Sequence, residues 1–329
     1  LAGVLIAGLL SSMISEVPLS VMLSQLFLLI KGFMIFYILA SLPMSEPVLK
    51  KYIKVFFVIS LLIFLLGIVD FVYPEEFRLV TGNKTGIDWR AGFPSVKSIF
   101  IHPGVFGWFM SFIGLYAFAF LLIFNKWRYL LISLVFSIGS FLSMRRKVLM
   151  GLFIGVLIGL LLSPVIKKIK LKYILIFILI GFLLIIPLWS PIETMFRDLI
   201  KTYIRPEDSI LVARNALYIT SAKIVKDYFP FGVGLGRYGS WMSRVHYSPI
   251  YYEYGLSNIY GLSPTKPNFI NDTFWPMIVG ELGIFGLFFY VWIIIYFVYI
   301  ALKQAKLSSS KYVSGFCLGT FMILIGSLV

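Results

Sequence analysis

Three consecutive basic residues, Arg145, Arg146 and Lys147, separate two apolar runs of the chain, 129–144 and 148–164. If both runs are membrane helices, the three cations lie at the tip of a helical hairpin. The lysines and arginines of the other short loops place this tip outside the cytoplasm, where such residues are normally sparse. Cations that oppose this bias favour an anion site, and phosphate or pyrophosphate suits a cationic cluster at headgroup depth. Snorkelling of the side chains to lipid phosphates is the alternative interpretation.

A long outer segment, 191–275, contains two further polar candidates. Apolar residues at helical spacing predict a helix over 208–228, with Arg214 on its polar side. Asp272 stands near the start of the next apolar run, where the dipole of a membrane helix would stabilise a carboxylate. N-capping explains the position of Asp272 about as well as catalysis does.

A glycine run, Gly232-Val-Gly234-Leu-Gly236, is predicted to end the 208–228 helix. Gly234-x-Gly236-x-x-Gly239 fits a dinucleotide-binding pattern, but that pattern needs a strand before it and a helix after it. Here a helix precedes the glycines and no strand does, so a tight backbone turn beside a ligand is the better interpretation. Glu281, roughly 13 Å deeper in the membrane than Asp272, is expected to have a buried partner.

The elements that must position these residues follow from composition. Hydrophobic residues make up 60% of the 329 positions and charged residues only 13%, with a mean hydropathy of +0.96, which excludes a soluble domain. A span needs about 20 apolar residues, and continuous rather than alternating apolar runs favour helices over a β-barrel. We therefore expect an all-α polytopic membrane protein, one transmembrane domain over 1–329, with further helices beyond one or both ends. The nine expected spans are 1–14, 20–41, 54–73, 103–124, 129–144, 148–164, 173–190, 276–301 and 312–329.

Four short loops contain twelve of the 29 lysines and arginines, with Glu46 as their one acid. They alternate along the chain as cytoplasmic loops should, which places 15–19, 74–102, 144–147 and 191–275 outside. The net charge of +15 is thus mainly a topology signal, and a nucleic-acid partner is not expected because the chain lacks a basic soluble face. The loops contain Lys50, Lys51 and Lys54; Lys126 and Arg128; Lys167, Lys168, Lys170 and Lys172; and Lys303, Lys306 and Lys311.

The segment 191–275 is the large extracytoplasmic loop, and it is rich in tyrosine and tryptophan. This composition indicates an ordered, partly helical loop. Exposed aromatic faces are suited to stacking on sugar rings, although an interfacial aromatic belt is an equal alternative. The single cysteine, Cys317, excludes disulfides within the chain, and two histidines without zinc-site spacing predict no metal centre and no cofactor.

Four segments together resemble the superfamily of bacterial O-antigen polymerases and O-antigen ligases, which are polytopic, GT-C-like glycosyltransferases. Arg90-Ala-Gly92 followed by Phe100-Ile-His102-Pro103 is similar to the Arg-x-Gly…Phe-x-His-Pro stretch of that family. Ser143-Met-Arg145-Arg146-Lys147 resembles its hairpin tip, with Arg146 in the register of the retained arginine. The two remaining segments are Arg214 through Phe229-Pro230-Phe-Gly232-Val-Gly234-Leu-Gly236, and Asp272 followed by Glu281-Leu-Gly283-Ile-Phe-Gly286.

One departure separates the two branches of that family. Its ligases have a His-Asn pair where this chain has Asp272-Thr273, and an acidic residue there is more similar to the polymerases. The histidine role of the ligases therefore does not carry over to this chain.

The resemblance implies a polysaccharide polymerase of the bacterial inner membrane with its active site facing outside. It would transfer glycan from undecaprenyl pyrophosphate to the terminal sugar of another lipid-linked repeat unit, in contact with membrane lipids and with a chain-length-regulating membrane protein as a candidate partner. Arg90, Arg146 and Arg214 would bind the pyrophosphate, with His102, Arg145 and Lys147 as further ligands, and Asp272 would orient or deprotonate the acceptor hydroxyl. An O-antigen ligase acting on lipid A core and a lipid-linked oligosaccharide flippase are the alternatives. A flippase should show internal repeats and short loops, and the sequence shows neither.

Overall fold

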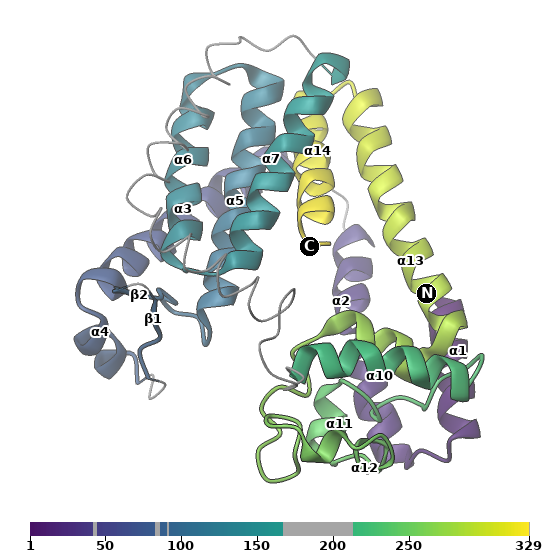
Figure 1. The fold of residues 1–329 in the computed structure, drawn as a ribbon. Helices are drawn as coiled ribbons and strands as arrows, with labels where there is room; N and C mark the ends of the chain where they lie inside the picture. The colour runs from purple at the N-terminus through teal and green to yellow at the C-terminus, as the bar shows by residue number, and fades with distance from the viewer. Residues whose placement is uncertain (42–44, 83–85, 91, 167–212, 329) are drawn as a thin grey trace. The chain divides into compact units, whose positions relative to one another are not determined.

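The computed structural model describes residues 1–41, 45–82, 86–90, 92–166 and 213–328, and most of these residues are helical (Figure 1). The helices Leu19–Ile38, Glu46–Val72, Pro103–Phe124 and Phe274–Leu307 are each long and apolar enough to cross a membrane. Shorter apolar helices cover Ala2–Ile14, Trp127–Leu142 and Lys311–Gly326. The chain is therefore an all-α membrane protein, as its composition predicts. The expected span 173–190 lies outside the described residues, so the total of nine spans stays a prediction.

The chain divides into two compact units. Unit 1 consists of Leu1–Pro43 and Phe196–Ile295, and unit 2 of Met44–Met195 and Tyr296–Val329. One transmembrane domain over 1–329 stays a prediction, and α13 contributes residues to both units. Unit 1 contains α1 (Ala2–Ile14), α2 (Leu19–Ser41), α10 (Ala213–Asp227), α11 (Trp241–Val245), α12 (Ile250–Glu253), the 3₁₀ turn η3 (Leu256–Asn258) and the first part of α13 (Phe274–Leu307). Unit 2 contains α3 (Glu46–Val72), α4 (Pro74–Val80), β1 (Trp89–Arg90), β2 (Phe93–Pro94), α5 (Pro103–Phe124), α6 (Trp127–Leu142), α7 (Arg146–Ile166), the end of α13 and α14 (Lys311–Gly326).

In unit 2, α5 is the central helix and packs against α6, α7 and α14 (Figure 1). Small residues bring α5 and α6 close together. The Ser133 hydroxyl of α6 donates a 3.0 Å hydrogen bond to the carbonyl of Gly114 on α5, and a side chain at Gly107 would collide with Ser143. Small residues and hydroxyl bonds of this kind are how membrane helices approach without a hydrophobic driving force between them.

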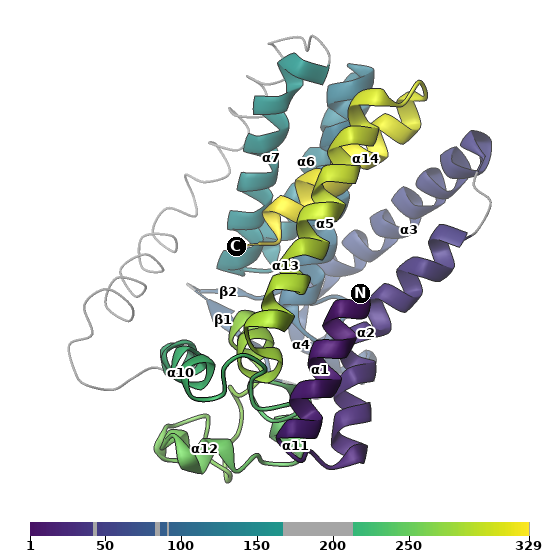
Figure 2. The same cartoon turned by 90° about the vertical axis from the view of Figure 1, so that its right-hand side faces the viewer.

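In unit 1, α1 packs beside α2, and α11 packs against α2 (Figure 2). The described segment 213–275 of this unit has a hydrophobic core of its own, in which Leu217 of α10 and the ring of Tyr251 are fully buried. The rings of Tyr238 and Tyr251 stack at 5.9 Å between centroids. The prediction that the segment 191–275 is partly helical is confirmed for its described part, 213–275, and its extracytoplasmic position stays a prediction.

Candidate functional site

The basic hairpin tip is formed by the end of α6 and the start of α7. Helix α6 ends at Leu142, Met144 takes a left-handed conformation (φ 52°), and α7 begins at Arg146. The prediction of a tight helical hairpin is confirmed. Arg146 and Lys147 stand in the first turn of α7, where the helix dipole is positive and is unfavourable for cations. Cations together with the free amides of a helix N-terminus make a site that favours an anion.

Asp88 brings two of the predicted basic residues together. Its Oδ2 accepts a 2.7 Å hydrogen bond from Arg145 Nη2 and a 3.3 Å hydrogen bond from Arg90 Nε. Arg90 Nη1 also donates to the carbonyl of Met144, at 3.4 Å. Arg90 and the hairpin tip are thus one cluster, although 55 positions separate the two arginines in the sequence. The sequence analysis did not identify Asp88, which stands two residues before Arg90.

Arg145 is the more enclosed of the two arginines. Its side chain is 19% exposed, against 32% for Arg90. Burial lowers the pKa of Arg145, the charge of Arg90 lowers it further, and Asp88 raises it. An arginine stays charged under all these conditions, so the cluster of two guanidinium groups and one carboxylate stays net positive. Arg145 Nε is buried and finds no hydrogen-bond acceptor among the described residues.

A separate charge cluster, which is buried, fixes the loop between β2 and α5. Asp70, near the end of α3, accepts hydrogen bonds from the backbone amides of Lys97 and Ser98 at 2.8 and 2.9 Å. Arg78 Nε of α4 lies 3.3 Å from the other carboxylate oxygen, and Arg78 also donates to the carbonyl of Ser95. The loop that leads from β2 to α5 is therefore held by one carboxylate. This cluster was not predicted from the sequence, because its members are distributed over 28 positions.

His102, expected to bind substrate, is the N-cap of α5. Its Nδ1 accepts a 3.0 Å hydrogen bond from the amide of Gly104, and Pro103 occupies the first helical position, where no amide is needed. This contact explains the presence of His102 without a ligand, and its contact with substrate stays a prediction.

Lys147 borders an apolar cavity of about 590 Å³ in unit 2. Most of its walls are aromatic. An isoprenoid or acyl chain is the kind of ligand that such walls accept, with the ammonium group available to a phosphate. The cavity is lined by Phe100, Val105, Trp108, Phe109, Phe112, Lys147 and Ser327.

In unit 1, Arg214 and Asp272 form an ion pair. Asp272 Oδ2 accepts from Arg214 Nη2 at 2.7 Å and from Arg214 Nε at 3.2 Å, and both side chains are partly exposed. Arg214 stands in the first turn of α10. Asp272 lies two residues before α13 begins at Phe274. N-capping and catalysis both stay predictions for Asp272.

The resemblance implies that Arg214 binds the same pyrophosphate as Arg90 and Arg146, and the ion pair with Asp272 was not predicted. Arg214 belongs to unit 1 and the tip to unit 2, so a shared site for the two stays a prediction.

The glycine run forms tight turns around Glu281. Gly232, Gly234, Gly236 and Gly239 all have positive φ, between 67° and 93°. The amide of Tyr238 donates a 3.1 Å hydrogen bond to Glu281 Oε1, and the amides of Gly236 and Arg237 also hydrogen-bond with this carboxylate. The tight turn and the buried partner of Glu281 are both confirmed, but the amides face a carboxylate of the protein itself.

The same run crosses α13 where that helix is broken. Gly283 has φ 64° and ψ −162°, which frees backbone groups of α13. The amide of Val233 donates to the carbonyl of Gly280 at 2.9 Å, and the amide of Ile284 donates to the carbonyl of Pro230 at 3.0 Å. Two glycine-rich segments that the resemblance uses thus pack backbone against backbone, which non-helical backbone at membrane depth requires.

The described part of the chain contains no group of three or more acidic, histidine or cysteine side chains placed to hold a metal ion. Comparison of the chain with protein-family models, with curated proteins and with solved structures found no match.

Proposed function

We propose that the chain is a polysaccharide polymerase that transfers glycan from undecaprenyl pyrophosphate to the terminal sugar of another lipid-linked repeat unit. The observation that carries the proposal is the convergence of Arg90 and Arg145 on the single carboxylate of Asp88. Two guanidinium groups that share one anion form the kind of multidentate site that a pyrophosphate occupies.

The donor role belongs to the cluster in unit 2. Arg90, Arg145 and Arg146 would hold the pyrophosphate, and Lys147 would add a fourth cation at the apolar cavity that suits the isoprenoid chain. When the glycosyl carbon–oxygen bond breaks, the electron pair stays on the pyrophosphate oxygen. Fixed cations stabilise that developing charge, so a strong general acid is not needed.

The acceptor role belongs to Asp272 in unit 1. Its carboxylate receives two hydrogen bonds from Arg214 on one oxygen, Oδ2, which leaves Oδ1 for a sugar hydroxyl. The hydroxyl oxygen would attack the anomeric carbon of the donor and pass its proton to Asp272 late in the transfer. Arg214 would act as a positioning residue for this carboxylate.

The test is transfer between purified lipid-linked repeat units by the full chain, with product length read from gels. Arg146→Ala should abolish polymerisation while the protein still inserts and accumulates. Asp272→Asn should retain donor binding and lose about 10²-fold or more of the turnover, as expected for a positioned acid–base group. Arg244→Gln is the matched control. Arg244 Cζ lies 5.3 Å from the ring centroid of Trp241, so this arginine is outside both the Asp88 cluster and the Arg214–Asp272 pair.

Three outcomes would contradict the proposal. Polymer of normal length from Arg146→Ala would mean that the basic side chains of the tip only contact lipid phosphates. Full turnover by Asp272→Asn would mean that Asp272 is only a structural ion-pair partner. Transfer to lipid A core by the unmodified chain would make it a ligase.

A further inference from the structure

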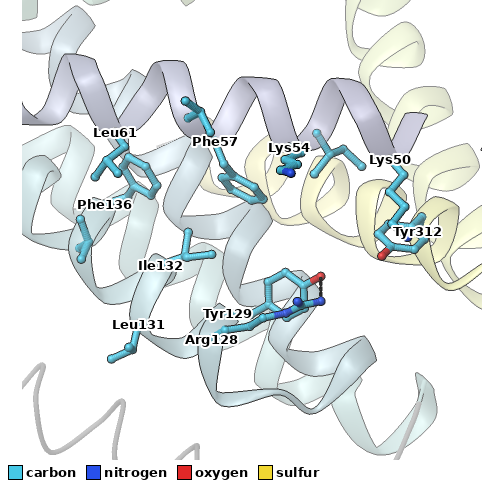
Figure 3. A pocket seen from close by; sticks show the side chains of 13 residues that line it. Lys50, Lys54, Phe57, Leu61, Arg128, Tyr129, Leu131, Ile132, Phe136 and Tyr312 are labelled. Carbon is cyan, nitrogen blue, oxygen red and sulfur yellow. Dashed lines mark hydrogen bonds between the residues drawn. The ribbon is translucent and has the colours of Figure 1, made fainter. Parts of the chain in front are cut away.

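A groove runs between α3 and α6 of unit 2, and the start of α14 closes one end of it (Figure 3). Its volume of about 510 Å³ is within the range of small-molecule sites, roughly 300–1,000 Å³. The walls are apolar: Ile53, Phe57, Val58 and Leu61 come from α3, and Leu131, Ile132, Val135 and Phe136 from α6. Phe136 forms a buried floor, whereas Val58 and Leu131 stay about half exposed.

Three cations stand at the closed end. Lys50 and Lys54 are one turn apart on α3, and Arg128 lies in the first turn of α6 across the groove (Figure 3). Lys50 Nζ is 5.5 Å from the ring centroid of Tyr312, and Arg128 Nη2 donates to the hydroxyl of Tyr129 at 3.2 Å. No acidic side chain is among the described residues that line the groove.

The helix dipoles add to this positive end. Helices α3, α6 and α14 all begin here, at Glu46, Trp127 and Lys311, so their positive ends lie on the side of the cations. Arg145 follows the other end of α6, a helix of 16 residues and thus roughly 24 Å long. The groove is therefore separate from the candidate donor cluster.

We propose that this groove binds one anionic phospholipid, with its phosphate at Lys50, Lys54 and Arg128 and an acyl chain along the apolar walls. Three cations without a lining acid select an anion, which disfavours a neutral lipid or an apolar helix as the occupant. The half-exposed apolar walls continue from those cations and would be covered by a hydrocarbon chain, which a free phosphate does not have. The chemistry of both parts together matches a single amphiphile.

A bound lipid should stabilise the protein, because it contacts two helices of the folded state at once. At a hundredfold excess over its dissociation constant, the expected rise in the unfolding temperature is roughly 5–10 °C. The full chain in neutral detergent would be heated with added phosphatidylglycerol, phosphatidylcholine or inorganic phosphate. Native mass spectrometry would count the lipids retained.

The decisive comparison uses two matched double variants. Lys54→Gln with Arg128→Gln removes one cation of the groove from each helix, and the bound phosphatidylglycerol should fall at least tenfold. Lys51→Gln with Lys126→Gln removes the same charge from the same two helix starts, at positions that do not line the groove, and it should bind like the unmodified chain.

If phosphatidylcholine stabilises the chain as much as phosphatidylglycerol does, the anionic headgroup is not what the groove selects. If inorganic phosphate does so, the acyl chain is not part of the bound ligand. Equal losses in both double variants would reduce the effect to general charge attraction. If the groove double variant does not fold, the single variant Lys54→Gln still decides, because unchanged phosphatidylglycerol binding in it contradicts the proposal.

Discussion

Replacing Asp70 by asparagine is expected to destabilise unit 2 and to loosen the segment that presents Arg90. Asp70 is fully buried, and so are its cationic neighbours Arg78 and Lys97, at 5% and 2% exposure. The carboxylate accepts two backbone amides on one oxygen and Arg78 on the other. An asparagine presents an NH₂ group toward one of these sets of donors, so it loses contacts as well as charge.

The magnitude follows from the burial of the partners. Removing one member of a buried ion pair typically costs 3–5 kcal/mol, because the remaining charge stays desolvated. Burial and Arg78 lower the pKa of Lys97, and Asp70 raises it, so the loss of Asp70 makes a charged Lys97 more costly still. At about 2–4 °C per kcal/mol, the unfolding temperature should fall by roughly 6–20 °C.

Thermal unfolding of the purified variant, followed by the loss of the monodisperse peak in size-exclusion chromatography, measures this change. Glu75→Gln on α4 is the control, because Glu75 is exposed and its loss of charge should change stability by no more than about 0.5 kcal/mol. Transfer assays at low temperature report whether the Arg90 segment is displaced. An unfolding temperature within 2 °C of the unmodified chain would refute the assigned role of Asp70.

Two further predictions concern unit 1. Gly232→Ala should destabilise the protein by more than the roughly 1–2 kcal/mol of a left-handed alanine, because the added Cβ would also meet the Gly280 carbonyl. Gly255→Ala is the control: Gly255 has a similar φ and open space around it, so this variant should lose only the conformational part of the stability. Equal losses of stability in the two variants, measured by denaturation, would contradict the close crossing. Burial raises the pKa of Tyr247 to about 12, with Tyr252 adding to the rise, and the Tyr247 hydroxyl donates a 2.7 Å hydrogen bond to a backbone carbonyl. Because the folded pKa is raised, this contribution is complete below the unfolded pKa near 10 and is lost as pH rises to about 12. Thermal unfolding against pH should therefore show a smaller loss above pH 10 in Tyr247→Phe, and identical profiles would contradict the assignment.

The local structure around the candidate site was predictable from the sequence alone. Apolar runs predicted the described membrane helices, because a span must satisfy its backbone internally over about 20 residues. The basic triplet between two such runs predicted the tip at Arg145–Lys147, and the glycines from Gly232 to Gly239 predicted tight turns. These features depend on neighbours within a few positions, which the order of residues records directly.

The partners of the charged side chains were decided by the tertiary structure. Nothing in the sequence pairs Asp88 with Arg145, Asp272 with Arg214, or Asp70 with the amides that follow β2, since each contact joins segments that periodicity does not relate. The sequence predicts that the glycine run forms a turn beside a ligand, but amides of this run face Glu281 of the same unit. Hydropathy and turn chemistry determine which segments become helices and where they end. Which carboxylate neutralises which cation depends on how those helices pack, so the tertiary structure decides it.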